Sequence, residues 1–346
     1  MAFASNSVVA KARAVYGRSL SAEDYSQLAS KESVADVCAY LKQTPRFSKT
    51  LASADPQSIH RAQLEARVQQ SVFNIFESFH KFDYTGSKGF FNYIVSELEI
   101  EQILLALQNA ASGSSVDFIA KLPLFLLDHS KVDLAALGHA GSLTEALEKL
   151  RGTEYESVIG DLLVSGAETG RFNICECERR LYNRYYLKML KGIERNHKGA
   201  ERKDLKRAVL RAVDMENVVT LYRYARIFGT DAADIPEKLI SFKYRLSGEM
   251  VERLAAQKDI NKIAAELASI GYGSGGGGGV PAAVEQLTER ISLDSMKKTL
   301  RLSQSSAVVY FALIQCLKTE LKNVKTVIEG IRYGMKSGDI LEMIVV

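Results

Sequence analysis

Glu320-Leu-Lys-Asn323-Val-Lys-Thr-Val-Ile328 is the stretch that decides the fold, because it is one of three copies of a pattern. An acid is followed three residues later by a carboxamide and then by an apolar run of helical type. The other copies are Glu99-Ile-Glu-Gln102-Ile-Leu-Leu-Ala-Leu107 and Asp214-Met-Glu-Asn217-Val-Val-Thr-Leu-Tyr222. Copies at such regular spacing predict one unit repeated three times.

A second motif advances in step with the first. Short amphipathic stretches end on an aromatic residue at Phe47, Tyr155 and Tyr272. Both motifs step by 106 to 117 residues, which predicts repeats over 1–107, 108–222 and 223–346. A unit of about 110 residues is too long for one solenoid step, so we expect three helical subdomains that close around an axis.

The chain reads as almost entirely helical. It contains only 5 Pro among 346 residues, and apolar residues step by three or four along the last repeat. These residues are Leu317, Leu321, Val324, Val327, Ile328 and Ile331. Such a stripe is typical of an amphipathic helix. Ser21 with Asp24, and Ser33 with Asp36, have the spacing of helix N-caps. We therefore predict an all-α protein.

Composition indicates a globular chain that can bury a sizeable core, with 47% hydrophobic and 25% charged residues. Lys11 and Arg13 interrupt the first apolar stretch, so no secretory signal is expected. The longest apolar run, 307–314, is far shorter than the roughly 20 residues that span a bilayer. Any membrane role is expected to be peripheral. Four scattered cysteines favour a reduced, cytosolic protein.

The sequence predicts no catalytic residue, cofactor or metal ion. The glycine run Gly271–Gly279 is expected to be a loop, and no Gly-Lys-Ser/Thr follows it as a phosphate-binding loop requires. Cys175 and Cys177 lack a second Cys or His pair at ligand spacing. No Ser-His-Asp or Cys-His arrangement is apparent.

The repeated acids and amides are interpreted as packing residues, because a position that occurs three times cannot be a single catalytic centre. An acid and an amide at i and i+3 share one helix face and can bind a neighbouring helix. The six residues of this structural motif are Glu99, Gln102, Asp214, Asn217, Glu320 and Asn323.

Segment 179–211 is strongly basic. Its 12 Lys and Arg face only three acids, which gives +9 against +4 for the whole chain. A long basic helix here could meet anionic headgroups, nucleic acid or an acidic protein, and the alternative is a solvated face. Tyr182, Tyr185 and Tyr186 interleave with the charges, as in some nucleic-acid binders. The candidate contact residues are Arg195, Lys198, Arg202, Lys203, Lys206 and Arg207.

These motifs resemble the C subunit of A/V-type rotary ATPases, the relative of the eukaryotic d subunit. The resemblance rests on Glu320-x-x-Asn323 with Gly330 and Gly334, and on the opening Ala12-Arg-Ala-Val-Tyr-Gly-Arg-Ser-Leu-Ser-Ala-Glu-Asp-Tyr25. The middle stretch Glu178-x-x-Leu181-x-Asn183-x-Tyr185-Tyr186 is also similar, although Asn183 stands where an acid is expected.

The resemblance implies a funnel-like body of three pseudo-symmetric units on the cytoplasmic face of the membrane. It implies an adaptor, a monomer within a larger complex, that holds the central shaft subunits on the proteolipid rotor ring and performs no chemistry. One alternative from another class is a helical protein that uses 179–211 as a scaffold or to bind nucleic acid, and the near-balanced total charge speaks against nucleic-acid binding. A helical enzyme is a second alternative, and it would need a pocket with convergent ionisable groups that the sequence does not show.

Overall fold

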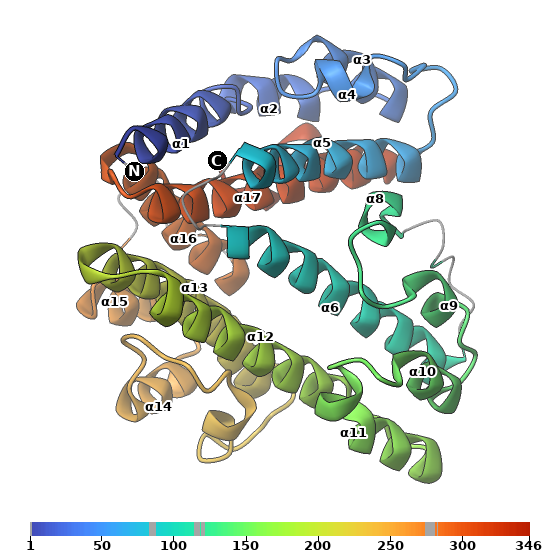
Figure 1. Ribbon diagram of the computed structural model, residues 1–346, viewed down its shortest axis with the longest axis vertical. Helices are drawn as coiled ribbons and strands as arrows, with labels where there is room; N and C mark the ends of the chain where they lie inside the picture. The colour runs from blue at the N-terminus through green and yellow to red at the C-terminus, as the bar shows by residue number, and fades with distance from the viewer. Residues whose placement is uncertain (1, 83–87, 114–117, 119–121, 274–280, 282) are drawn as a thin grey trace. The chain divides into compact units, whose positions relative to one another are not determined.

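The computed structural model describes residues 2–82, 88–113, 118, 122–273, 281 and 283–346 (Figure 1). In these ranges the chain forms α-helices and one short 3-10 helix, η1, and no strand. The predicted all-α class is confirmed. Most of the predicted glycine-rich loop, 274–279, lies outside the described residues. The chain divides into two compact units, one of 1–87, 198–237 and 243–346, the other of 88–197 and 238–242.

The larger unit, unit 1, contains helices from both ends of the chain. Its elements are α1 (Ala2–Tyr16), α2 (Ala22–Ala29), α3 (Val34–Gln43), α4 (Ser48–Leu51), α5 (Arg61–Phe82), α13 (Gly199–Arg226), η1 (Ile235–Lys238), α14 (Gly248–Ala256), α15 (Ile260–Ser269), α16 (Val284–Leu302), α17 (Ser306–Arg332) and α18 (Ser337–Met343).

Helix α17 is the centre of unit 1. Helices α1, α5, α13 and α16 all pack against it. The apolar run 307–314 forms its first turns, and all eight of its residues are buried. A helix that is apolar on every side is buried in a core, so this run marks the core of unit 1.

The predicted helix starts near the N-terminus are confirmed. Ser21 caps α2 with a complete capping box to Asp24, and Ser33 caps α3 by accepting from the Asp36 N–H. Arg13 belongs to the opening stretch of the family resemblance, and it caps the C-terminal end of α16. Its guanidinium donates to the carbonyls of Leu300, Arg301 and Ser303 at 2.8–3.0 Å, which satisfies carbonyls that a helix end leaves free.

The structure requires glycine at two positions of the family resemblance, for a different reason at each. Gly334 follows α17 with φ +67°, a left-handed conformation that favours glycine at helix ends. At Gly330, an added Cβ would lie 2.7 Å from the Cγ1 atom of Ile340 on α18. Only a residue without a side chain lets α18 approach α17 this closely.

The smaller unit, unit 2, is built on two long helices that pack together, α6 (Lys88–Ser112) and α12 (Ile174–Asn196). Short helices α8 (Leu124–Leu127), α9 (Leu134–Gly138) and α10 (Leu143–Leu150) pack on α6, and α11 (Glu156–Thr169) joins α10 to α12. Gly192 allows the close approach of the long pair, since an added Cβ would lie 2.0 Å from the Tyr93 hydroxyl oxygen.

Candidate functional site: carboxylate clasps and a basic cavity

The three predicted acids are buried in long helices, Glu99 in α6, Asp214 in α13 and Glu320 in α17. Each accepts hydrogen bonds from backbone N–H groups that precede a pair of short helices. Glu99 accepts from the N–H of Lys131 at 2.7 Å, and Asp214 accepts from the N–H groups of Tyr244 and Arg245 at 2.9 and 2.7 Å. Glu320 accepts from the Leu20 N–H at 2.7 Å.

The same carboxylates also bind a side chain that follows each pair of short helices. The Tyr155 hydroxyl donates to Glu99 at 2.7 Å, and the Tyr272 hydroxyl donates to Asp214. Arg46 Nε lies 3.0 Å from Glu320 Oε2. We call this arrangement a carboxylate clasp: one buried acid that holds both ends of a helix pair, α9–α10, α14–α15 or α2–α3.

The aromatic motif explains two of the three clasps. Tyr155 and Tyr272 reach an acid through a hydroxyl, but Phe47 has none and is completely buried. Its neighbour Arg46 forms an ion pair with Glu320 instead. A phenylalanine cannot donate a hydrogen bond to a carboxylate, so in the first copy the aromatic motif does not mark the residue that contacts the acid.

Burial and the neighbouring acids raise the pKa of both clasp tyrosines. Burial raises the pKa of Tyr155, and the negative charge of Glu99 raises it further. Burial also raises the pKa of Tyr272, and its hydrogen bond to Asp214 adds to that effect. Desolvation raises the pKa of Glu320 against the opposing effect of Arg46. A phenol with a raised pKa remains a hydrogen-bond donor at neutral pH.

The three amides have different surroundings. Asn323 forms two hydrogen bonds with the backbone of Val345, donating from Nδ2 at 2.6 Å and accepting at Oδ1 from an N–H at 3.2 Å. These bonds hold the C-terminal segment against α17. Asn217 is completely buried in α13. Gln102 is also buried, yet its Oε1 atom has no hydrogen-bond partner among the described residues.

The prediction that segment 179–211 forms one long basic helix is wrong. Segment 179–211 divides between α12, which ends at Asn196, and α13, which begins at Gly199. His197 and Lys198 are extended, and Gly199 has φ +57°. A left-handed residue cannot continue an α-helix. The segment therefore contributes one helix to each unit.

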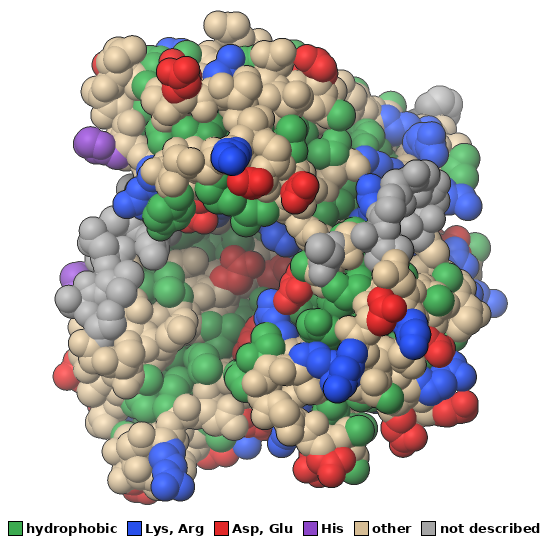
Figure 2. Space-filling view, turned by 180° about the vertical axis from the view of Figure 1, so that it is seen from behind, with side chains coloured by type: hydrophobic (Ala, Val, Ile, Leu, Met, Phe, Trp, Pro, Cys, Tyr) green, Lys and Arg blue, Asp and Glu red, His purple; other side chains and the backbone are tan. Residues whose placement is uncertain are grey.

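The six candidate contact residues accordingly do not share one helix. Arg195 belongs to α12 in unit 2, whereas Lys198, Arg202, Lys203, Lys206 and Arg207 belong to unit 1. All are exposed except Lys206, which is half-buried, and Arg207 forms an ion pair with Asp204 at 2.7 Å. On the face drawn in Figure 2, Lys and Arg side chains are interspersed with Asp and Glu.

The aromatic residues of the basic segment are largely core. Tyr185 and Tyr186 are 6% and 5% exposed, and their rings meet edge to face with centroids 4.9 Å apart. Stacking on nucleic-acid bases requires an accessible ring face. These two rings do not offer one.

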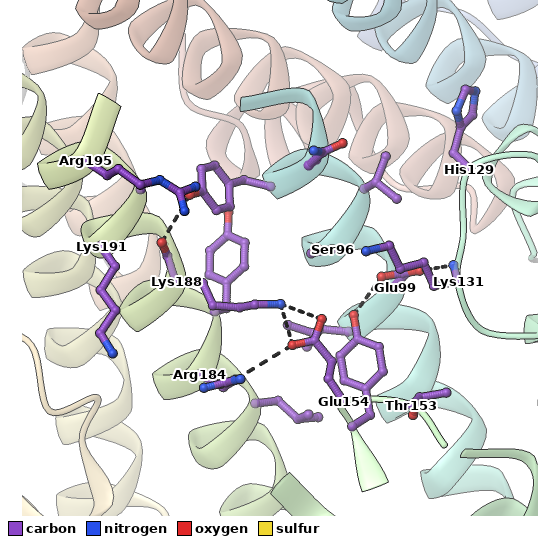
Figure 3. A pocket seen from close by; sticks show the side chains of 18 of the residues that line it. Ser96, Glu99, His129, Lys131, Thr153, Glu154, Arg184, Lys188, Lys191 and Arg195 are labelled. Carbon is purple, nitrogen blue, oxygen red and sulfur yellow. Dashed lines mark hydrogen bonds and ion pairs between the residues drawn. The ribbon is translucent and has the colours of Figure 1, made fainter. Parts of the chain in front are cut away.

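Unit 2 contains a cavity of about 910 Å³ between α6 and α12 (Figure 3). Arg184, Lys188, Lys191 and Arg195 line it from α12, and Lys131 lines it from the loop before α9. The acidic lining residues are Glu99, which is held in its clasp, and Glu154. Glu154 forms ion pairs with Lys188 and, at 3.8 Å, with Arg184.

Sequence reasoning did not identify Glu154 or Tyr93 as part of this cavity. Tyr93 on α6 donates a hydrogen bond to the Lys188 carbonyl at 3.1 Å and so crosses to α12. The four cations of α12 could have been predicted from the sequence to lie together, since their steps of four, three and four residues place them on one helix face. Glu154 lies in a short loop where no periodicity points to it.

The arrangement is suited to binding and to holding the helices in place. Its clasp acids are committed to hydrogen bonds, and across the described ranges no three His, Cys, Asp or Glu converge to hold a metal ion. Within the same ranges, no helix has both the length and the apolar character needed to cross a bilayer.

Comparison with known proteins agrees with these features. The family described as ATP synthase (C/AC39) subunit matches residues 8–343. The A-type ATP synthase C subunit of Pyrococcus abyssi is 27% identical, over 97% of this chain and 88% of its own length. The Pyrococcus horikoshii protein of the same name is 25% identical over the same shares of both chains. The Thermococcus kodakarensis one is 26% identical, over 76% of this chain and 67% of its own. The match covers every clasp, and the chain therefore belongs to the ATP synthase (C/AC39) subunit family.

Proposed function

We propose that this chain is a non-catalytic central-stalk adaptor of an A/V-type rotary ATPase. It joins the rotating shaft to the membrane proteolipid ring and transmits torque for ion transport coupled to ATP hydrolysis or synthesis. The observation that carries the proposal is the family match over residues 8–343. The relatives named as the C subunit of A-type ATP synthases add support.

The carboxylate clasps support a torque-bearing role. Each clasp joins a predicted repeat to the next, Glu99 to Tyr155 and Asp214 to Tyr272, and the last joins Glu320 back to Arg46. Buried charge-assisted hydrogen bonds are stronger than neutral ones. On this proposal the repeats 1–107, 108–222 and 223–346 form a closed, funnel-like body that does not yield when one partner turns against the other.

The adaptor works as a monomer within the complex, peripheral on the cytoplasmic face of the membrane. An adaptor that rotates with both partners needs an interface with each that does not slip, on the order of 1,200 Å² or more in total. It uses no cofactor, and neither nucleotide nor nucleic acid is its ligand. The basic residues 195–207 are candidates for contact with a partner or with headgroups.

Reconstitution tests this function. Complexes of catalytic head, shaft and ring are prepared in vesicles with and without this chain, and ATP hydrolysis and ion transport are measured in parallel. We expect hydrolysis without transport when the chain is omitted, and restored transport when the purified chain is added back. Full coupling without the chain would refute the adaptor role.

A further inference from the structure

Four cations form a stripe along one face of α12. Arg184, Lys188, Lys191 and Arg195 are separated by four, three and four residues, and all four line the cavity of unit 2 (Figure 3). At about 1.5 Å per residue, the stripe is roughly 16 Å long. We call it the α12 stripe.

The two ends of the α12 stripe differ in charge balance. Glu154 forms ion pairs with Arg184 and Lys188. Lys191 and Arg195 are exposed, and no carboxylate in the described part of the chain forms an ion pair with either. Lys131 adds a further cation to the lining, and Glu99 is already held by its clasp. The cavity therefore carries uncompensated positive charge.

The wall beneath the stripe is ordered before any ligand binds. The Tyr93 hydroxyl bonds the Lys188 carbonyl, and Gly192 leaves room for the Tyr93 ring. Glu154 fixes the Lys188 ammonium. Side chains that are already held lose less entropy on binding.

Shape selects among anionic ligands. A compact anion is bound best by cations that converge on one point, whereas these cations follow a line. A flat bilayer cannot follow a line into a recess between two helices. An acidic α-helix can, because its carboxylates at steps of four, three and four residues also form a line of about 16 Å.

We infer that the α12 stripe binds an acidic α-helical segment of a protein partner, with Lys191 and Arg195 as the main contacts. The inference deepens the proposed adaptor function and rests on it for the identity of the partner as a subunit of the complex. Charge complementarity of this kind sets specificity and the rate of association.

Direct binding tests the stripe with the purified full chain. The probe is a helical peptide with Glu at steps of four, three and four residues, and the matched peptide has Gln at those positions. We expect the Glu peptide to bind at least about tenfold more tightly, and its affinity to fall as salt rises from about 50 to 300 mM. Equal binding of both peptides, or no binding of the Glu peptide, would overturn the inference.

Paired variants locate the contact. Lys191→Glu with Arg195→Glu should weaken Glu-peptide binding at least about tenfold and create binding of a Lys peptide. The matched control, Lys149→Glu with Arg171→Glu, reverses two exposed cations of unit 2 that do not line the cavity. It should change binding less than about twofold. Equal losses in both variants would mean that only net charge matters, which would overturn the assignment to the stripe.

Two further ligands separate the alternative sources of negative charge. Tripolyphosphate represents a compact anion, and phosphatidylglycerol vesicles represent headgroups. If either binds more tightly than the Glu peptide and depends on Lys191 and Arg195, the protein-partner inference is wrong. Reconstitution is measured separately. If transport depends on the chain but the Glu peptide does not bind, the stripe inference has failed and the adaptor function stands. If the Glu peptide binds but the chain does not couple hydrolysis to transport, the adaptor function has failed.

Discussion

Arg46 Nε lies 3.0 Å from Glu320 Oε2, and both side chains are almost fully buried, at 2% and 5% exposed. The pair joins the loop after α3 to the central helix α17, so residues near the two ends of the chain share one ion pair. Desolvation raises the pKa of Glu320, and Arg46 opposes that rise. Together with the bond from the Leu20 N–H to Glu320, the pair ties both ends of the α2–α3 pair to α17.

Removing only Arg46 should destabilise the protein strongly. Arg46→Met leaves the Glu320 carboxylate buried without its counter-ion, which typically costs about 3–5 kcal/mol in the free energy of unfolding. The double variant Arg46→Met with Glu320→Gln removes the charge and retains an acceptor for the Leu20 N–H. Urea unfolding should show that the double variant is more stable than the single one.

The pH dependence of the stability lost in Arg46→Met tests whether Glu320 is the group left unpaired. A carboxyl whose folded-state pKa is raised contributes stability below its unfolded pKa and loses it as pH rises through the folded value. The destabilisation by Arg46→Met should therefore be larger at pH 8 than at pH 4.5. Equal losses at both pH values would show that Glu320 is not the group left unpaired.

The tyrosine clasps offer a matched comparison. Tyr155→Phe and Tyr272→Phe each remove one hydroxyl that donates to a buried acid, with little change in shape. Each should lower the free energy of unfolding by about 1–3 kcal/mol. Tyr40→Phe is the control, because that hydroxyl bonds Asp24 of α2, which is half-buried and not fully buried like the clasp acids, and it should cost less. A neutral result for one clasp tyrosine alone would contradict the proposed equivalence of the repeats.

Sequence reasoning reached the all-α class and the N-caps because both depend on local composition and spacing. It also singled out Glu99, Asp214 and Glu320, which are buried where hydrogen bonds hold them. The sequence did not predict the contact of Arg46 with Glu320, because the aromatic motif falls on the next residue, Phe47. It missed the end of α12 at Asn196, because His197, Lys198 and Gly199 are individually tolerated in helices. The cavity depends on long-range placement of Glu154 and Tyr93, which periodicity does not encode.

Gly192 should resist substitution although alanine is the better helix former. Gly192→Ala gains about 1 kcal/mol in helix propensity, but its Cβ would lie 2.0 Å from the Tyr93 hydroxyl oxygen. Such overlap costs more, so a net loss of about 1–3 kcal/mol is expected by urea unfolding. In a Tyr93→Phe background the same substitution should cost clearly less. Equal costs in both backgrounds would exclude this contact as the cause.

The repeated amides should respond unequally to replacement by leucine. Asn323→Leu leaves the buried N–H and carbonyl of Val345 unpaired, at about 1–3 kcal/mol for each group. Gln102→Leu removes an oxygen that has no partner in the described part of the chain and should change the free energy of unfolding by less than about 1 kcal/mol. Thermal unfolding measures both variants. A larger loss for Gln102→Leu would reverse this interpretation.

Acid sensitivity should depend on Glu176 at the start of α12. Its hydrogen bond with Arg179 lowers the pKa of Glu176 from a usual value near 4.5, and Arg180 lowers it further. A carboxyl with a lowered folded-state pKa contributes stability above its unfolded pKa and loses it as pH falls through the folded value. Stability should therefore decline below about pH 4.5, and Glu176→Gln should make that decline shallower. Glu168→Gln, at an exposed position on α11, should leave the slope unchanged. If both variants follow the unsubstituted chain, the Arg179–Glu176 bond contributes nothing to acid sensitivity.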